Sequence, residues 1–212
     1  MSAKIAAEWK DNSYYDDAEQ TAWLAPFWER PRFRTKFDQL DITAYVEIAC
    51  GHGRHTHYIL DVLRDTHVRS ARLVDVVDDN VGFCARRFAS DARVQVLRNN
   101  GEDLAGIADA SATAVFSYDA MVHFEYDTVI SYVGEAFRVL APGGRALLHH
   151  SNYDGNPGGY YRDNPHWRNF MTRALLAHVA LRTGFTILEQ GVTHWNQDPG
   201  LDCISLLEKP AA

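Results

Sequence analysis

The sequence predicts an α/β fold: a seven-stranded sheet, mostly parallel, with a C-terminal antiparallel hairpin and helices on both faces. Two observations predict it. From about residue 44 onward, short and almost wholly apolar runs alternate with segments of helical periodicity, which is typical of parallel strands covered by helices. The last two strand-like runs, 185–195 and 202–209, are joined only by a turn that contains Pro199 and Gly200, so we expect them to pair antiparallel.

The expected elements follow in chain order. Trp23, Phe27 and Trp28 have the i, i+4, i+5 spacing of a short amphipathic helix, which Pro31 should end. Later helices are expected at 54–65, 79–89, 126–140 and 167–182. The parallel strands are expected at 44–50, 71–77, 93–99, 112–120 and 145–151. The sequence APGG should end the longest of these helices and turn into the next strand.

Length and composition fit one globular domain that spans residues 1–212. The net charge is -7 with histidine neutral, and the 21 basic residues are scattered, so no nucleic acid is expected as a partner, because phosphate binding needs a basic face. No apolar run approaches the ~18–20 residues of a membrane span, and the first residues do not resemble a signal peptide. The three cysteines are far apart, which favours a reduced, cytoplasmic protein.

A glycine-rich turn and a later acidic residue indicate a cofactor site. The segment VEIACGHGRHT places Glu47, Gly51 and Gly53 where the first strand meets the first helix, and glycines there let a ligand approach the backbone. Asp75 lies 22 residues after Gly53, where a carboxylate can accept from both hydroxyls of a ribose. A dinucleotide fingerprint would have glycine where Thr56 stands. The alternative is that the glycines only make a tight turn and that Asp75 caps the next helix.

The same segment resembles motif I of class I S-adenosylmethionine (SAM)-dependent methyltransferases, (E/D)-x-G-x-G-x-G, with Ala49 in place of the first glycine. Further segments are similar to later motifs of that family, in the same order: NNGEDL at 99–104, AVFSYDAMVHF at 114–124 and EAFRVLAPGG at 135–144. The resemblance implies the Rossmann-like fold of the class, SAM as cofactor and S-adenosyl-L-homocysteine as product. The cofactor-binding residues that we expect are Glu47, Ala49, Cys50, Gly51, Gly53, Asp75, Val76, Asn100, Gly101, Glu102, Ser117 and Tyr118.

Methyl transfer to a hydroxyl needs a group that takes up the acceptor's proton, and histidine suits this role because its ordinary pKa is about 6.5. His123 follows the fourth strand, and His149 and His150 lie near the end of the fifth. Consecutive strand residues point to opposite faces, so one of that pair is expected in the site and the other in the core. His123 is our first candidate for the base and one of the pair the second. Asp119 would orient such a histidine or hold the amino group of the cofactor.

The expected acceptor is a hydroxyl of a small molecule, such as a sugar or a secondary metabolite. The sequence SYDA differs from the (N/D)-P-P-(Y/F) tetrapeptide typical of amide and nucleobase N-methyltransferases, which favours oxygen. Two segments rich in aromatic residues should enclose the acceptor: an N-terminal helical lid, 1–42, and the loop 152–170 after the fifth strand. The acceptor-side residues that we expect are Tyr15, Trp23, Trp28, Tyr153, Trp167 and Trp195.

The sequence leaves several alternatives open. N-methylation of a small amine and a SAM-binding regulatory protein without turnover both fit the motifs. His52, His55 and His57 have a spacing compatible with a metal site, but they span a turn and the start of a helix, so we expect no metal there. A divalent ion shared by Asp119 and a histidine is the remaining metal hypothesis. Assembly as a homodimer is also left open.

Overall fold

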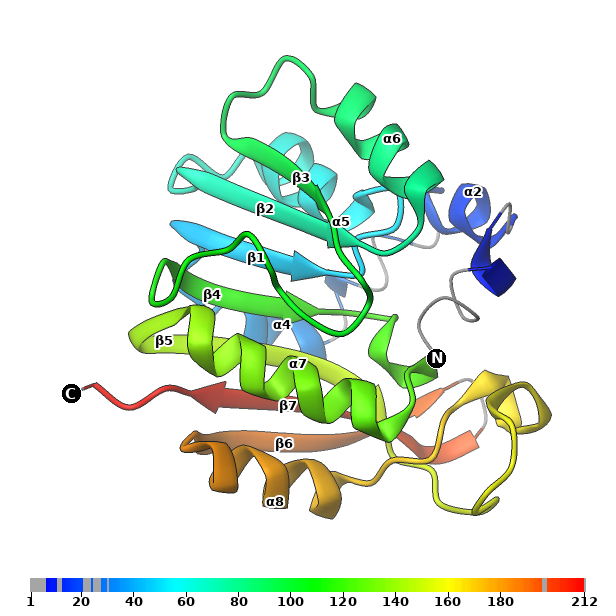
Figure 1. Ribbon diagram of the computed structural model, residues 1–212. Coiled ribbons are helices and arrows are strands. Elements are labelled where there is room, and N and C mark those ends of the chain that lie inside the picture. Colours follow the sequence, from blue (N-terminus) through cyan, green and yellow to red (C-terminus); the bar gives the residue numbers. More distant parts are fainter. Residues whose placement is uncertain are drawn as a thin grey trace.

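Figure 1 shows the computed structural model, which describes residues 7–10, 13–20, 24, 28–29, 31–195 and 198–211. Its seven-stranded sheet has the order β3-β2-β1-β4-β5-β7-β6. The strands are β1 (Ala44–Ile48), β2 (Ser70–Asp75), β3 (Val94–Arg98), β4 (Ala112–Ser117), β5 (Leu140–Ser151), β6 (Thr186–Trp195) and β7 (Asp198–Glu208). Strands β1 to β5 pair in parallel, and β7 pairs antiparallel with both β5 and β6. The predicted sheet with its C-terminal antiparallel hairpin is confirmed.

The helices alternate with the strands. The α-helices are α2 (Tyr14–Ala18), α4 (Pro31–Phe37), α5 (Arg54–His57), α6 (Asp78–Arg87), α7 (Tyr126–Val139) and α8 (Arg173–Thr183). Shorter elements are the π-helix η1 (Tyr58–Val62) and the 3-10 helices η2 (Met121–His123), η3 (Tyr161–Asp163) and η4 (Pro165–Trp167). Of the predicted amphipathic helix, Trp23 and Phe27 lie outside the described residues. Within the described ranges, no helix has the length and apolarity that crossing a membrane requires.

Helices cover both faces of the sheet, and each face has its own apolar core. In Figure 1, α7 and α8 lie in front of the sheet, where they bury residues such as Val133 and Leu176. On the opposite face, α4 and α6 contribute to a second core, in which Phe33 is fully buried. Neighbouring strand residues alternate between the two, so that Tyr45 of β1 belongs to one core and Val46 to the other.

The carboxyl ends of β1, β2 and β4 meet at one edge of the sheet. Ile48 pairs with Val74 of β2, and Glu47 pairs with Phe116 of β4, so the three strands end at nearly the same level. The chain proceeds from β1 to β2 on one side and later places β4 on the other, and this change of direction opens a crevice beyond the strand ends. The candidate site is therefore expected beyond these three strands.

The predicted helix 54–65 is shorter and less regular than expected. Its α-helical part, α5, ends at His57 and continues as the π-helix η1. The backbone N–H of Leu63 donates to the carbonyl of Tyr58, five residues earlier, at 2.8 Å. An apolar period near 3.6 cannot distinguish one wide π turn from the surrounding α-helix, so this turn was not predictable.

The fifth strand begins earlier than predicted. It starts at Leu140, directly after α7, and Leu140 pairs with Ala112 before Arg145 pairs with Ala114. The sequence APGG therefore forms a bulge inside β5 and not a turn before it. Gly144 is needed there, because an added Cβ would lie 2.9 Å from the carbonyl oxygen of Ala141.

The loop 152–170 contains the 3-10 helices η3 and η4 and is not structureless. The helix predicted from Trp167 begins only at Arg173, capped by Thr172, whose side chain accepts from a backbone N–H of the first turn. His166 and Trp167 have φ values of 48° and 57°, which a right-handed helix cannot accommodate. The helix α8 therefore begins after these two residues, later than the composition of the segment suggests.

Candidate functional site

A hollow opens at the carboxyl ends of β1, β2 and β4. It encloses about 740 Å³ including its open mouth. Its inner walls are the glycine turn after β1 and the residues that follow β2 and β4, and its outer wall carries Trp9, Tyr14 and Tyr15. The predicted cofactor residues that line it are Ala49, Cys50, Gly51, Asp75, Val76 and Tyr118.

The turn between β1 and α5 depends on left-handed backbone conformations. Gly51 and Gly53 have φ values of 55° and 73°, and Ala49 also has φ of 55°. Ala49 thus keeps the conformation of the glycine that it replaces in the resembled motif, at a cost of roughly 1–2 kcal/mol. At Gly53 an added Cβ would lie 2.7 Å from a ring carbon of Phe88, so no larger residue fits without a shift. Gly53 supports the turn from beneath, while Gly51 faces the hollow and contacts the ring of Tyr15.

Asp75 connects the end of β2 to the glycine turn. Its Oδ2 accepts from the backbone N–H of Gly51 at 2.8 Å, and its Oδ1 accepts from the N–H of Val77 at 2.9 Å and from Asn80 Nδ2 at 3.3 Å. Burial raises the pKa of this carboxyl. The carboxylate lines the hollow, where it can accept a hydrogen bond from a ligand hydroxyl.

Glu47 lies beneath the turn and does not line the hollow. It is buried, and the Thr56 hydroxyl donates to its Oε2 at 2.6 Å. The same hydroxyl lies 2.9 Å from the hydroxyl of Tyr45. Burial raises the pKa of Glu47 to about 7. The acid of the resembled motif therefore fixes the start of α5 from below.

A cluster of Arg54, Asp119 and Tyr14 forms part of the lining of the hollow. Arg54 Nη2 donates to Asp119 Oδ2 at 2.8 Å, and the Tyr14 hydroxyl donates to the same oxygen. Burial alone would raise the pKa of Asp119, but the Arg54 guanidinium holds it below its ordinary value. Tyr14 and Arg54 were not predicted. Arg54 directly follows Gly53 and is the first residue of α5, the helix beside the site. This position next to the glycine turn is the signal that could have identified it.

His123, the first candidate for the base, also lines the hollow, where its ring centroid lies 5.0 Å from that of Trp9. Its Nδ1 lies 2.8 Å from the carbonyl oxygen of Trp167, which requires a proton on Nδ1 and leaves the lone pair on Nε2. Burial, assisted by the positive charge of Arg168, lowers the pKa of His123 to about 4. The imidazole is therefore neutral at physiological pH, with Nε2 able to accept a proton.

Both nitrogens of His149 and of His150 have protein partners. His149 Nδ1 accepts from the backbone N–H of Asp119 at 3.1 Å, and its Nε2 lies 3.2 Å from Asp202 Oδ2. His150 Nδ1 lies 2.8 Å from its neighbour's carbonyl oxygen and its Nε2 2.9 Å from Ser205 Oγ. The two rings point to opposite faces, and both are buried. Neither lines the hollow, so the structure places His149 behind the site and not at its surface.

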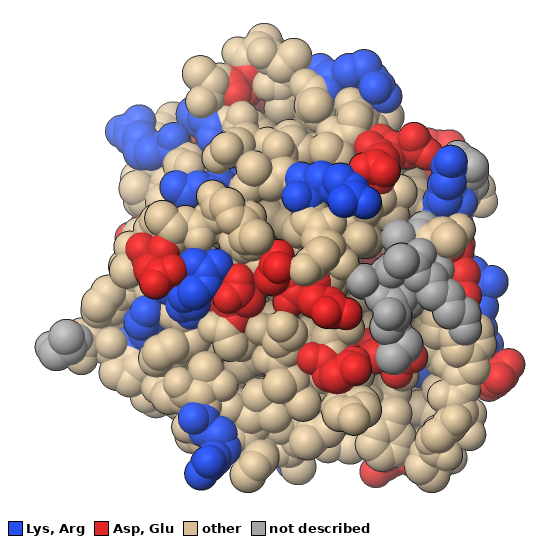
Figure 2. Space-filling model, in the orientation of Figure 1, with Lys and Arg blue, Asp and Glu red and all other residues tan. Residues whose placement is uncertain are grey.

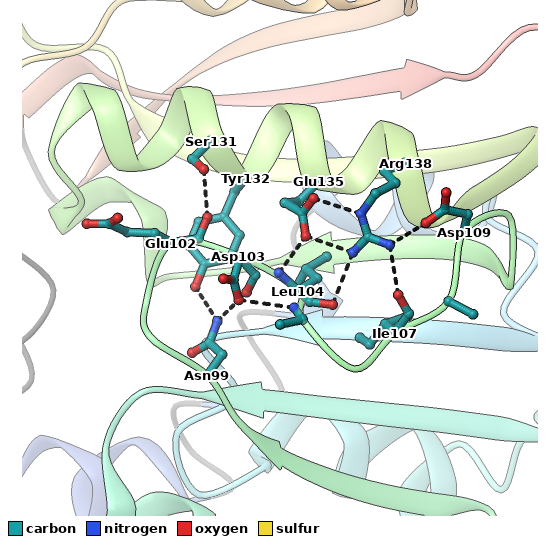
Figure 3. Close-up of polar contacts among 12 residues, drawn as sticks. Asn99, Glu102, Asp103, Leu104, Ile107, Asp109, Ser131, Tyr132, Glu135 and Arg138 are labelled. Carbon is teal, nitrogen blue, oxygen red and sulfur yellow. Dashed lines mark hydrogen bonds and ion pairs between the residues drawn. The ribbon is translucent and has the colours of Figure 1, made fainter.

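The loop after β3 packs on α7 and does not reach the hollow (Figure 3). Asn99 Nδ2 donates to the Tyr132 hydroxyl at 2.8 Å, and the Ser131 hydroxyl donates to the carbonyl of Glu102 at 2.7 Å. Asn100 is exposed, and its side chain accepts from backbone N–H groups within the same loop. The predicted cofactor residues Asn100, Gly101 and Glu102 thus form a turn that α7 holds at the margin of the site.

The predicted acceptor-side residues are dispersed. Tyr15 lines the hollow, and Trp167 lies beside it, with its ring centroid 6.0 Å from that of Trp9. Trp28 is fully buried, and its Nε1 donates to His55 Nδ1 at 3.2 Å, so it packs in the core. Tyr153, Trp195 and, on the cofactor side, Ser117 also lie outside the lining, and the Ser117 hydroxyl donates to the Ile48 carbonyl.

The three histidines of the glycine turn diverge. His52 stacks between the rings of Tyr15 and Phe83, with centroid distances of 4.8 and 3.9 Å. His55 is buried, and His57 pairs with Asp61 at the surface. Among the described residues, no three His, Cys, Asp or Glu side chains converge as metal ligands would.

A family model of the methyltransferase domain matches residues 46–144. The matched segment, just under half of the chain, is thus similar to the methyltransferase domain family. The matched segment contains the glycine turn, Asp75, Asp119 and His123 and ends at the bulge of β5. SAM is the methyl donor of this class, so the cofactor that the motifs predicted is confirmed at the level of the family. No curated protein sequence matches the chain.

Solved structures confirm the class I methyltransferase fold. A SAM-dependent methyltransferase from Mesorhizobium loti is 14% identical over 92% of this chain and 99% of its own, with a TM-score of 0.65. Geranyl diphosphate C-methyltransferase from Streptomyces coelicolor A3(2), in complex with Mg2+, geranyl diphosphate and S-adenosyl-L-homocysteine, is 13% identical over 98% and 97%, with a TM-score of 0.70. A chain of the Haloferax volcanii complex between the Trm112 methyltransferase activator and a methyltransferase is 16% identical over 97% of both chains, with a TM-score of 0.68.

Proposed function

We propose that the methyltransferase domain transfers a methyl group from SAM to a hydroxyl of a small molecule. The observation that carries this proposal is one hollow that joins the glycine turn and Asp75 to His123. Methyl transfer is an in-line displacement, which needs the donor and a proton-accepting group to face the same enclosed space. The hollow offers both.

Two sets of residues would hold the cofactor. The glycine turn and the Asp75 carboxylate, which both line the hollow, suit its ribose, and the Arg54–Asp119 pair suits the carboxylate and ammonium groups of its amino-acid end. Arg54 and Asp119 pair with each other in this structure, so each would exchange part of that contact for the ligand. When bound, SAM supplies an electrophilic methyl group on a sulfonium. The protein's own residues orient it and exclude water around it.

Of the described residues in the predicted lid 1–42, those around α2 cover the hollow. Trp9, Tyr14 and Tyr15 line it, and the Tyr15 ring lies against Gly51. In contrast, α4 belongs to the core, and its buried Lys36 pairs with Glu189 of β6. We therefore assign the lid role to the segment around α2, which has to adjust when a ligand reaches Gly51.

His123 is the base in this proposal. Its Nδ1 proton is fixed on the Trp167 carbonyl, so Nε2 is the atom that takes up the acceptor's proton. A base with a pKa near 4 accepts this proton only while the new bond to oxygen forms, because the hydroxyl then becomes strongly acidic. The aromatic rings of Trp9 and Trp167 beside it would exclude water from this step.

Replacing His123 should separate catalysis from cofactor binding. We expect His123→Ala to lower kcat by about 10²–10³-fold, with S-adenosylhomocysteine bound as tightly as in the wild type. In the wild type, kcat/KM should fall only as the pH drops through about 4, because the depressed pKa keeps the base deprotonated above that value. Assays with labelled SAM and the best acceptor from a panel of hydroxylated metabolites would measure both.

The surface residue His57 provides the matched control, since it pairs with Asp61 away from the hollow. His57→Ala should leave kcat unchanged. An unchanged kcat in His123→Ala, or an acid limb near pH 6.5, would contradict the assignment of His123 as the base.

The same panel tests the alternative functions. Figure 2 shows the face of the molecule that is seen in Figure 1, with acidic side chains across its middle and scattered Lys and Arg. This distribution favours a small acceptor over a nucleic acid. Transfer to amines but not to alcohols would favour the N-methyltransferase, and SAM binding without any transfer would favour the regulatory protein. A homodimer and a cytoplasmic location stay predictions, which gel filtration and cell fractionation would test.

A further inference from the structure

A line of buried polar side chains connects the loop after β5 to Asp119, two residues beyond the end of β4. Its members are Arg168 from the loop, Asp202 from β7 and His149 from β5, and their side chains are at most 2% exposed. None of the three lines the hollow. Polar groups buried this deeply are costly unless every one of them is paired, so their arrangement calls for a specific role.

Arg168 and Asp202 form the anchored end of this line. Arg168 Nε donates to Asp202 Oδ1 at 2.8 Å and Nη2 donates to Oδ2 at 2.7 Å, which is a bidentate ion pair. The guanidinium also lies 4.5 Å from the ring centroid of Trp195 and donates from Nη1 to the carbonyl of His166 at 2.9 Å. Its plane is thus fixed on several sides, and so is the carboxylate that it holds.

Asp202 determines which nitrogen of His149 bears a proton. Its Oδ2 can only accept, so His149 Nε2 donates to it, at 3.2 Å. The lone pair is then on Nδ1, where the backbone N–H of Asp119 donates at 3.1 Å. His149 therefore transmits a defined orientation from Asp202 to the backbone of Asp119.

Asp119 needs such support because its backbone is strained. Its φ of 58° lies in the left-handed region, which costs a residue with a Cβ conformational free energy. In this conformation its carboxylate meets Arg54 at 2.8 Å. A right-handed backbone at this position would turn the carboxylate away from that contact.

We propose that Arg168, Asp202 and His149 are positioning residues, which hold Asp119 in its left-handed conformation and so direct its carboxylate to Arg54 at the cofactor end of the hollow. The proposal rests on the proposed function for its readout, which is cofactor binding. It also explains why the loop 152–170 and the C-terminal hairpin contribute buried charges close to the hollow, although no described residue of either segment lines it.

The test compares three variants by calorimetric titration with S-adenosylhomocysteine. His149→Phe keeps a ring of similar shape but removes both hydrogen bonds, and it should weaken binding about tenfold. His149→Asn retains an acceptor near the position of Nδ1 and should restore binding to within about threefold of the wild type. His150→Phe removes a neighbouring buried histidine whose partners lie away from Asp119, and it should change binding by less than about threefold.

A double-mutant cycle distinguishes positioning from a general loss of structure. If His149 acts through the Asp119 carboxylate, His149→Phe should change binding by less than about twofold in an Asp119→Ala background. Equal loss in both backgrounds, or equal loss in His150→Phe, would overturn the proposal. A wild type that fails to bind S-adenosylhomocysteine would instead overturn the proposed function.

A measurement on the wild type covers the case in which His149→Phe does not fold. Nitrogen-15 NMR of histidine-labelled protein should show His149 with its proton on Nε2 and a hydrogen bond to Nδ1 from the Asp119 amide. A proton on Nδ1 would abolish that hydrogen bond, because the backbone N–H of Asp119 can only donate, and it would also overturn the proposal.

Discussion

Asp75→Asn should weaken binding of S-adenosylhomocysteine by at least about 100-fold, which corresponds to roughly 3 kcal/mol. The carboxylate accepts from the backbone N–H groups of Gly51 and Val77 on its two different oxygens. An amide has only one oxygen, so its NH2 group would face one of these N–H donors. The variant would thus lose either the contact that ties Gly51 to the end of β2 or the one to Val77, and with it part of the acceptor that a ribose hydroxyl needs.

Asp78 is the matched control for this substitution. It lies three residues further on, its side chain is 77% exposed, and it pairs with Arg98 at the surface. Asp78→Asn should therefore bind the ligand as the wild type does. Thermal unfolding of both variants would show whether Asp75→Asn still folds, and a folded Asp75→Asn with wild-type affinity would contradict the assigned role of the carboxylate.

Gly53→Ala should lower the free energy of unfolding by about 3–4 kcal/mol. The left-handed backbone at Gly53, with φ of 73°, costs an alanine roughly 1–2 kcal/mol. In addition, the new Cβ would lie 2.7 Å from Phe88 Cε2 and 3.1 Å from Cys84 Sγ, and such overpacking typically costs ~1–3 kcal/mol. Both neighbours are buried and cannot move aside easily. Urea denaturation would measure the loss.

Gly106→Ala separates the two contributions. Gly106 has φ of 87°, but an added Cβ there would meet no atom within 4 Å. It should thus lose only the conformational part, roughly 1–2 kcal/mol. The difference between the two variants measures the clash at Gly53, and equal losses would show that the turn has more room than the structure indicates.

The sequence predicted those parts of the fold and site that depend on local backbone requirements. Glycines at 51 and 53 and an acid at 75 mark a turn that only a few residue types can form, so they predicted directly the turn that borders the hollow. The order of the strands and helices followed from apolar periodicity, which is also a local property of the sequence. The bulge at 141–144 was missed because a P-G-G sequence is equally compatible with a turn between elements and with a bulge inside a strand.

Pairings between distant residues were not predictable. Arg54 and Asp119 are 65 residues apart, and His149 and Asp202 are 53 apart, so nothing local marks them as partners. The same limit explains Trp28 and Tyr15, which both occur in the aromatic N-terminal segment. One is buried in the core and the other lines the hollow, and only the packing of α4 against the sheet decides this. The expected split of His149 and His150 onto opposite faces followed from strand geometry, but their hydrogen-bond partners did not.

The central claim is that the hollow beyond β1, β2 and β4 binds SAM through the glycine turn and Asp75. Titration of the wild-type protein and of Asp75→Asn with S-adenosylhomocysteine tests it most directly. The structure predicts one bound molecule per wild-type chain and a loss of at least about 100-fold in the variant. A folded wild type that binds no S-adenosylhomocysteine, or equal affinities in the two proteins, would contradict it.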